Sequence, residues 1–232
     1  RLPGQARAGM RGHDRRAILA IALLALAPEA RSEDTMSEEL HAAAIANDVA
    51  LINRLLAAGA AVDGRDRAKR TALLAACRAN AVAAAQALIA AGADVNAKDN
   101  IRDTPFLFAG AEGRLEILRT ILATGRADLK DTNRYGGTAL IPAAHHGHPD
   151  TVTLLLKTEI DVDHVNRLGW TALLETIILS DGGPVHQNIL AQLIAAGADV
   201  NLADGEGVSP LAHARSRGYS AMIAMLEKAG AR

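Results

Sequence analysis

A regular spacing of Thr and Ser residues is the feature that most constrains this chain. Five of them follow one another at intervals of 33, 34, 33 and 38 residues: Thr71, Thr104, Thr138, Thr171 and Ser209. Glycines recur in step with them, at Gly59, Gly92, Gly125, Gly197 and Gly230. A unit this short cannot bury its own apolar face, so it must stack on its neighbours. The spacing therefore predicts a repeat solenoid, an architecture that usually provides a binding surface rather than a catalytic site.

The composition agrees with thin stacked layers. Half of the 232 residues are hydrophobic but only 2% are aromatic, and alanine supplies much of the apolar count. Small side chains let helices approach one another closely. The formal net charge is −1, so no overall field attracts nucleic acid, and we expect no nucleic-acid partner. Cys77 is the only cysteine, which excludes an internal disulfide and a cysteine-rich metal site.

The first residues have the pattern of an export signal. A basic segment follows Met10, and an apolar run extends from Ala17 to Ala27. This order is typical of a secretory signal peptide, and the run is shorter than the roughly 20 residues that span a bilayer. We expect residues 1–32 to be a signal peptide with upstream residues, cleaved after Ser32 or after Ala27, and the protein to be periplasmic or secreted. Translation from Met36 would instead give a cytoplasmic protein.

Each unit reads as a pair of helices. The Thr or Ser is expected to cap the first, short helix, and the prolines in Thr104-Pro105 and Ser209-Pro210 fit a first helical turn. The second helix has apolar residues at helical spacing and ends at a glycine, which can adopt the left-handed conformation.

Several segments at this one period resemble the ankyrin repeat: Ala91-Gly-Ala-Asp-Val-Asn96, Ala143-Ala-His-His-Gly-His148, Gly169-Trp-Thr-Ala-Leu173 and Ala196-Gly-Ala-Asp-Val-Asn201. The resemblance covers residues 37 to 232. It implies an all-α repeat solenoid in which each unit has two antiparallel helices and a β-hairpin loop. Within a repeat domain of residues 33–232, it gives about six units: 37–66, 67–99, 100–133, 134–166, 167–204 and 205–232.

Three departures from the pattern affect local structure. Glu159-Ile160 replaces Gly-Ala in unit four, so the second helix there must end differently. Lys69 and Asn80 stand where the family usually has glycine, which predicts weaker turns in unit two. Unit five is five residues longer, and Ser180–Asn188 is expected to lengthen the turn between its helices. This insertion is either a tolerated surface loop or a functional one.

The resemblance also implies a concave face, lined by loop tips and by the ends of the first helices. These positions are not needed for folding, so their content reports on a partner. We therefore predict partner binding by Arg67, Arg70, Arg78, Ile101, Arg134, Tyr135, His145, His146, Arg167, Leu168, Trp170, Ile178 and Leu179. Tyr and Trp dominate interface hot spots, and clustered exposed apolar residues mark interaction sites. The alternative is that Trp170 packs on neighbouring loops and that the insertion covers Ile178 and Leu179.

No catalytic motif stands out. The chain has neither a Gly-x-Ser-x-Gly segment nor a phosphate-binding glycine loop. We expect no cofactor, no catalytic residue and no metal, and a monomeric, non-catalytic module that binds another protein without a stable membrane span. The alternative function is an enzyme accessory or weak metal-dependent hydrolase, which would use His145 and His146 together with the inserted loop and His186.

Overall fold

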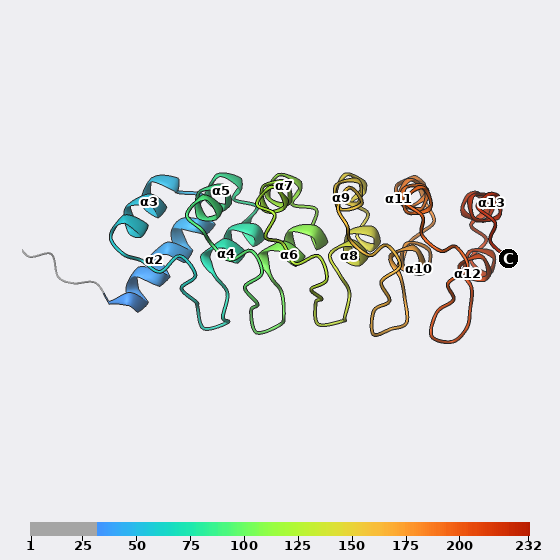
Figure 1. Ribbon diagram of the computed structural model, residues 1–232, viewed down its shortest axis with the longest axis horizontal. Helices are drawn as coiled ribbons and strands as arrows, with labels where there is room; N and C mark the ends of the chain where they lie inside the picture. The colour runs from blue at the N-terminus through green and yellow to red at the C-terminus, as the bar shows by residue number, and fades with distance from the viewer. Residues whose placement is uncertain (1–31) are drawn as a thin grey trace, which may run out of the picture. The chain divides into compact units, whose positions relative to one another are not determined.

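The computed structural model describes residues 32–232, so the expected signal peptide lies outside it except for Ser32. The described residues form twelve helices in six pairs, which Figure 1 shows side by side in one row. The first helices of the pairs are α2 (Glu33–Ile45), α4 (Ala72–Ala79), α6 (Pro105–Ala111), α8 (Leu140–His145), α10 (Ala172–Ile178) and α12 (Pro210–Ser216). The second helices are α3 (Val49–Ala57), α5 (Val82–Ala90), α7 (Leu115–Ala123), α9 (Pro149–Leu155), α11 (Pro184–Ala195) and α13 (Ser220–Lys228).

The pairs stack in two layers. Each first helix contacts the first helix of the next unit, and each second helix contacts the next second helix. Small residues permit this spacing: a Cβ on Gly110 of α6 would lie 2.9 Å from the Cβ of Ala139, which precedes α8. The large fully buried residues, such as Leu73, Phe106 and Leu140, lie between the layers. The expected all-α repeat solenoid is therefore confirmed.

Four of the five expected helix caps are present. The side-chain oxygens of Thr71, Thr104, Thr171 and Ser209 each accept a hydrogen bond from the backbone N–H three residues further on. Such caps satisfy N–H groups that the helix itself leaves free.

Thr138 is the exception, and the prediction of a cap there is wrong. Its Oγ1 is buried without a hydrogen-bond partner among the described residues, and α8 begins only at Leu140. In the other four units the carbonyl of the capping residue accepts the N–H four residues on. In unit four that position is Pro142, which has no N–H and disfavours helical geometry at the residue before it.

The ends of the second helices follow the glycine pattern. Gly59, Gly92, Gly125, Gly197 and Gly230 all have positive φ, between 66° and 94°. Unit four ends differently, as expected: the hydroxyl of Thr158 donates to the carbonyl of Leu155 at 2.6 Å and accepts from the N–H of Ile160.

The loops between units are tight turns rather than β-hairpins with strands. The described residues contain no named strand, and a single isolated bridge joins Arg65 to Thr71. Each turn is built on one Asp or Asn, whose Oδ1 accepts the backbone N–H groups two and four residues later: Asp66, Asp99, Asn133, Asn166 and Asp204. These residues recur at the period of the Thr residues, a signal for tight turns that the Thr and Gly spacing alone does not reveal.

Lys69 and Asn80 keep the backbone that glycine would adopt. Their φ angles are 59° and 53°, so the turns have the left-handed geometry of the glycine-containing units. A residue with a Cβ carries a conformational penalty of roughly 1 kcal/mol in that region.

The five-residue insertion in unit five is divided between turn and helix. α11 has 12 residues, three more than the longest of the other second helices. The turn before it is fixed from unit six, because the hydroxyl of Tyr219 donates to the carbonyl of Ser180 at 2.6 Å. The expectation that the insertion only lengthens the turn is therefore corrected.

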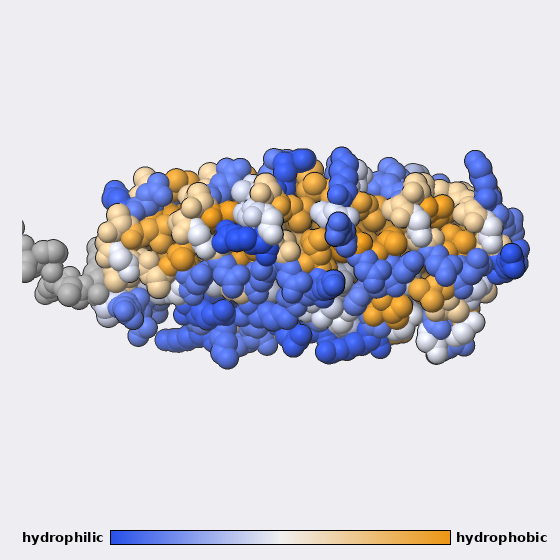
Figure 2. Space-filling model, in the orientation of Figure 1, coloured by the Kyte–Doolittle hydropathy of each residue, from blue (hydrophilic) through white to orange (hydrophobic). Residues whose placement is uncertain are grey.

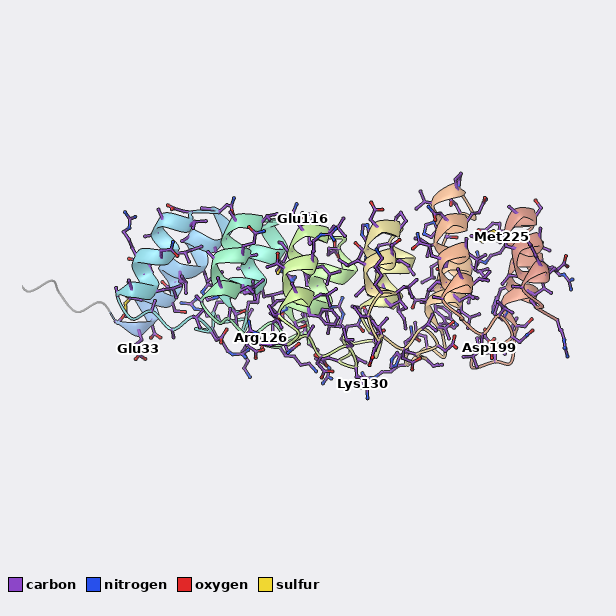
Figure 3. All side chains as sticks on the ribbon, turned by 45° about the horizontal axis from the view of Figure 1, so that its top comes forward. Glu33, Glu116, Arg126, Lys130, Asp199 and Met225 are labelled. Atoms are coloured by element: carbon purple, nitrogen blue, oxygen red, sulfur yellow. The ribbon has the colours of Figure 1, made fainter. Side chains whose placement is uncertain are left out.

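Polar residues also join successive units. Asn96 accepts the N–H of Asp128, and Asn201 accepts the N–H of Arg232, so the Asp-Val-Asn segments connect neighbouring loops. Figure 3 shows Arg126, Lys130 and Asp199 on these loops.

Among the helices of residues 32–232, none combines the length and apolar character that crossing a bilayer requires.

Candidate functional site

A hollow of about 440 Å³ lies between the loop tips and the first helices of units three to five. We call it the central groove. Its walls come from the ends of α6, α8 and α10 and from the turns that precede α8 and α10. It is lined by Asp103, Leu107, Phe108, Ala111, Glu112, Asn133, Arg134, Tyr135, Gly137, Ile141, Pro142, His145, His146, Asn166, Leu168, Glu175 and Leu179.

Apolar side chains on the rim of the groove are open to solvent. Tyr135, Leu168 and Leu179 are 53%, 54% and 41% exposed, although a soluble protein gains free energy by covering such residues. Tyr135 and Leu168 are held by the Asn133 and Asn166 turns, which fix their backbone N–H groups. Figure 2 shows largely hydrophilic loops in the N-terminal half and hydrophobic atoms among the loops nearer the C-terminal end.

The structure brings together six of the thirteen predicted binding residues. These six line the central groove: Arg134, Tyr135, His145, His146, Leu168 and Leu179. Three others line a second hollow beside α2 and α4: Arg67, Arg70 and Arg78. The remaining four line neither hollow: Ile101, Arg167, Trp170 and Ile178.

Trp170 and Ile178 are half-buried, whereas Ile101 is exposed at its loop tip. The backbone of Trp170 belongs to the Asn166 turn, where its N–H donates to Oδ1 and its carbonyl accepts the N–H of Asn166. The inserted turn leaves Leu179 accessible. The exposed apolar surface of unit five is thus provided by Leu168 and Leu179 more than by Trp170.

Most of the predicted arginines already have partners within the chain. Arg70 pairs with Asp66 at 2.7 Å, and Arg78 lies 3.5 Å from Asp103 with its guanidinium 4.7 Å from the centre of the Phe108 ring. Arg134 lies over the ring of Tyr135 at 4.8 Å, and Arg167 donates to the carbonyl of Arg134.

A buried carboxylate forms part of the groove wall, and it was not among the residues predicted from the sequence. Glu175 of α10 is only 6% exposed. Its Oε1 accepts a hydrogen bond of 2.8 Å from Asn166, which joins the helix to the turn before it. Burial raises the pKa of Glu175, an effect that the Asn166 bond and the nearby His146 partly oppose. The available signal was a single charged residue, a glutamate, on an otherwise uncharged first helix.

Two further acidic residues line the groove. Glu112 is exposed at the end of α6, and Asp103 is half-buried beside Arg78. Burial raises the pKa of Asp103, as does the neighbouring Asp99, while Arg78 acts in the opposite direction. The groove therefore combines apolar side chains with three carboxyl groups.

The histidines of unit four lie close together but are held by separate contacts. The ring centres of His145 and His146 are 4.9 Å apart. His146 Nδ1 lies 2.7 Å from the carbonyl of Ala111, and the His148 ring packs on Gly113. Burial lowers the pKa of His145, and the neighbouring His146 and His186 lower it further.

Residues 32–232 contain no group of three His, Cys, Asp or Glu side chains arranged to hold a metal ion. His186 contributes its Nε2 to a contact of 3.0 Å with the carbonyl of His145, so it is turned to the backbone rather than to a shared ligand. The geometry gives the metal-dependent alternative no support.

Comparison with known proteins agrees with this architecture. A family model for ankyrin repeats in three copies matches residues 21–99, 40–133 and 106–204. An ankyrin repeat protein of Escherichia coli (strain K12), YahD, is 40% identical over 107 residues, which are 46% of this chain and 53% of that protein. The chain thus spans about half the length of this curated relative.

Solved structures match over a larger part of the chain. An ankyrin repeat domain from Acinetobacter baumannii AYE is 56% identical with a TM-score of 0.81, covering 83% of this chain and 98% of that one. The ankyrin repeat domain of Bcl-3, a member of the IkappaB family, is 27% identical with a TM-score of 0.76, covering 84% and 86%. Since the family model alone spans residues 21–204, the chain belongs to the ankyrin repeat family.

Proposed function

We propose that this protein is a non-catalytic module that binds a segment of a partner protein in the central groove. Ankyrin repeat domains are protein-interaction modules, and their fold is typically without catalytic function. The observation that carries the choice of surface is the groove itself, with Tyr135, Leu168 and Leu179 exposed along a hollow of about 440 Å³. Clustered exposed apolar residues around a hollow are typical of binding sites.

The groove suits rigid docking. Its loop tips are held by the tight turns built on Asn133 and Asn166. Its first helices pack against the first helices of the units on either side. A surface that is already ordered loses little conformational entropy on binding, so more of the contact free energy appears as affinity.

Binding through the groove is tested with a pair of matched surface variants. The full chain is used as bait for extracts of the source cell, alongside Tyr135→Ser/Leu168→Ser and Val185→Ser. Val185 is 48% exposed and does not line the groove, so it controls for general loss of apolar surface. We expect a partner that is retained by the wild type and by Val185→Ser and lost with the groove variant. Equal retention by all three proteins would place the binding surface elsewhere.

The compartment and the oligomeric state are part of the proposal. We infer export from the basic and apolar pattern of the first residues, and a monomer because nothing in the repeat pattern requires a second copy. Light scattering of the purified chain checks the latter, and a stable dimer would contradict it.

A further inference from the structure

The central groove has an acidic site within its apolar lining. Glu175 is a groove-lining carboxylate more than nine-tenths buried, and Asp103 and Glu112 stand on the same walls. Of the three, Asp103 has a cation of the chain beside it, Arg78 at 3.5 Å. No Arg or Lys of residues 32–232 forms an ion pair with Glu175 or Glu112.

The second oxygen of Glu175 lacks a proper donor. Oε1 is bound to Asn166, whereas in the described part of the chain Oε2 faces His145 Nδ1 at 3.6 Å. That separation is too long for a hydrogen bond. Burial and the neighbouring His146 and His186 also lower the pKa of His145, which disfavours the charged form that could pair with Glu175. A carboxylate in this position is destabilised by its burial and gains from any cation that reaches it.

Two residues of the groove wall, Asp103 and Phe108, already hold a guanidinium, which belongs to Arg78 of the second hollow. Arg78 lies with its guanidinium 4.7 Å from the centre of the Phe108 ring while it meets the carboxylate of Asp103. The groove lining offers the same two kinds of group again, a carboxylate at Glu175 in unit five and an aromatic ring at Tyr135 in unit four, which has the guanidinium of Arg134 on one side. Guanidinium groups stack on aromatic rings and bind carboxylates through two parallel N–H bonds.

We propose that the partner segment inserts one basic side chain, an arginine by preference, into the central groove to meet Glu175, with apolar residues on either side of it covering Tyr135, Leu168 and Leu179. This proposal rests on the groove being the binding surface and specifies the chemistry that it recognises. The carboxylate of Glu112 also lines the groove, is exposed to solvent, and attracts the incoming cation electrostatically.

The test begins with a library of random 12-residue peptides displayed on phage, selected on the full chain at pH 7.5. We expect the selected sequences to share one Arg or Lys flanked by apolar residues. A synthetic peptide of that type should bind the Glu175→Gln variant roughly tenfold or more weakly than the wild type, because a buried charge pair is lost. Glutamine keeps an oxygen for Asn166, and Glu159→Gln, an exposed glutamate outside the groove, is the matched control.

A second peptide identifies the pairing. Replacing its arginine by citrulline removes the charge and keeps the shape. If the arginine meets Glu175, citrulline should weaken binding to the wild type by a similar factor and have little further effect on Glu175→Gln. Independent losses from the two changes would overturn the pairing. Should Glu175→Gln melt well below the wild type, Glu112→Gln provides the same comparison at an exposed position, with a smaller loss expected.

The outcomes separate this inference from the proposed function. Peptides that are lost with Leu168→Ser but contain no basic residue, or that bind Glu175→Gln as well as the wild type, would leave the groove as the binding surface and refute the basic side chain. Peptides that bind Leu168→Ser and Glu175→Gln as tightly as the wild type would show that the groove is not the binding surface.

Discussion

The hydroxyl of Tyr219 donates a hydrogen bond of 2.6 Å to the carbonyl of Ser180, and so fastens the inserted turn of unit five to unit six. The ring takes part as well, because a Cβ on Gly182 would lie 2.6 Å from it. The insertion borders Leu179 of the central groove. The rigidity of the inserted turn therefore affects how accessible that end of the groove is to a partner.

Tyr219→Phe is expected to loosen this turn without unfolding the stack. The change removes one hydrogen bond and keeps the ring, so the free energy of unfolding should fall by about 1 kcal/mol. Hydrogen exchange should become faster at the amides of residues 180–183, and a thermal melt gives the stability change. Tyr135→Phe, the same change on an exposed residue, is the control. Unchanged exchange in Tyr219→Phe would show that the ring alone holds the turn.

Leu140→Ala and Leu173→Ala should each destabilise the protein by about 2–5 kcal/mol. Both residues are buried between helix layers, at equivalent positions of units four and five. Leu168→Ala, in contrast, trims an exposed residue and should change stability by less than about 0.5 kcal/mol. Chemical denaturation of the three variants measures the differences, and wild-type curves for both buried positions would contradict the register of the repeats.

The parts of the fold that were predictable are those that one local pattern determines. A Thr cap requires only a backbone N–H three residues later, and a glycine at a helix end requires only a positive φ angle at that residue. Both signals are local, so the spacing of these residues predicts where the two helices of each unit begin and end. The prediction of a cap at Thr138 was wrong because it considered the Thr residue alone and not Pro142, four residues later. The two signals conflict, and the missing N–H of proline decides the outcome.

The groove was less predictable because its content depends on contacts between units. The family pattern places Tyr135 and Leu168 at loop tips, and the structure has both of them lining the groove. Glu175 was not, because its burial comes from its place between the Asn166 turn and His145 of the preceding unit. Trp170 shows the converse: it stands at a tip position in the sequence, yet it is half-buried and does not line the groove.

Pro142→Ala is expected to stabilise the protein, against the general tendency of substitutions. Alanine supplies the N–H that the carbonyl of Thr138 lacks, and it allows the helix to begin one residue earlier, at Ala139, with Thr138 as its cap. We expect a gain of about 1 kcal/mol, less than the roughly 3 kcal/mol penalty of an interior proline, because Pro142 lies near the start of the helix and alanine makes the unfolded chain more flexible.

Pro184→Ala is the matched control for this change. Pro184 occupies the first turn of α11, where a proline loses no helical hydrogen bond, so its replacement should give no gain. Differential scanning calorimetry of both variants measures the effect. A lower melting temperature for Pro142→Ala would show that unit four needs the proline.

Export is tested at the N-terminus of the mature protein. If residues 1–32 are a signal peptide, the protein recovered from the periplasm or medium should begin at Glu33 or, for the other cleavage site, at Pro28. Mass spectrometry of the intact protein distinguishes these masses from a cytoplasmic product that begins at Met36. Replacing Arg15 and Arg16 by glutamate should reduce export, because a signal peptide needs its basic start.

Glu175→Gln should change the stability of the free protein in a pH-dependent way. Because burial raises the pKa of Glu175 in the folded state, the folded protein keeps this proton over a range in which the unfolded chain, near the ordinary value of 4.5, has already lost it. The wild type therefore loses stability as pH rises through that window, whereas glutamine has no proton to lose. The variant should match the wild type below pH 4 and exceed it at pH 7, as measured by urea denaturation at each pH. Glu159→Gln, at an exposed position, should follow the wild type throughout. If Glu175→Gln instead proved less stable at neutral pH, the carboxylate would have a stabilising cation within the chain, and the partner would have no unpaired charge to meet.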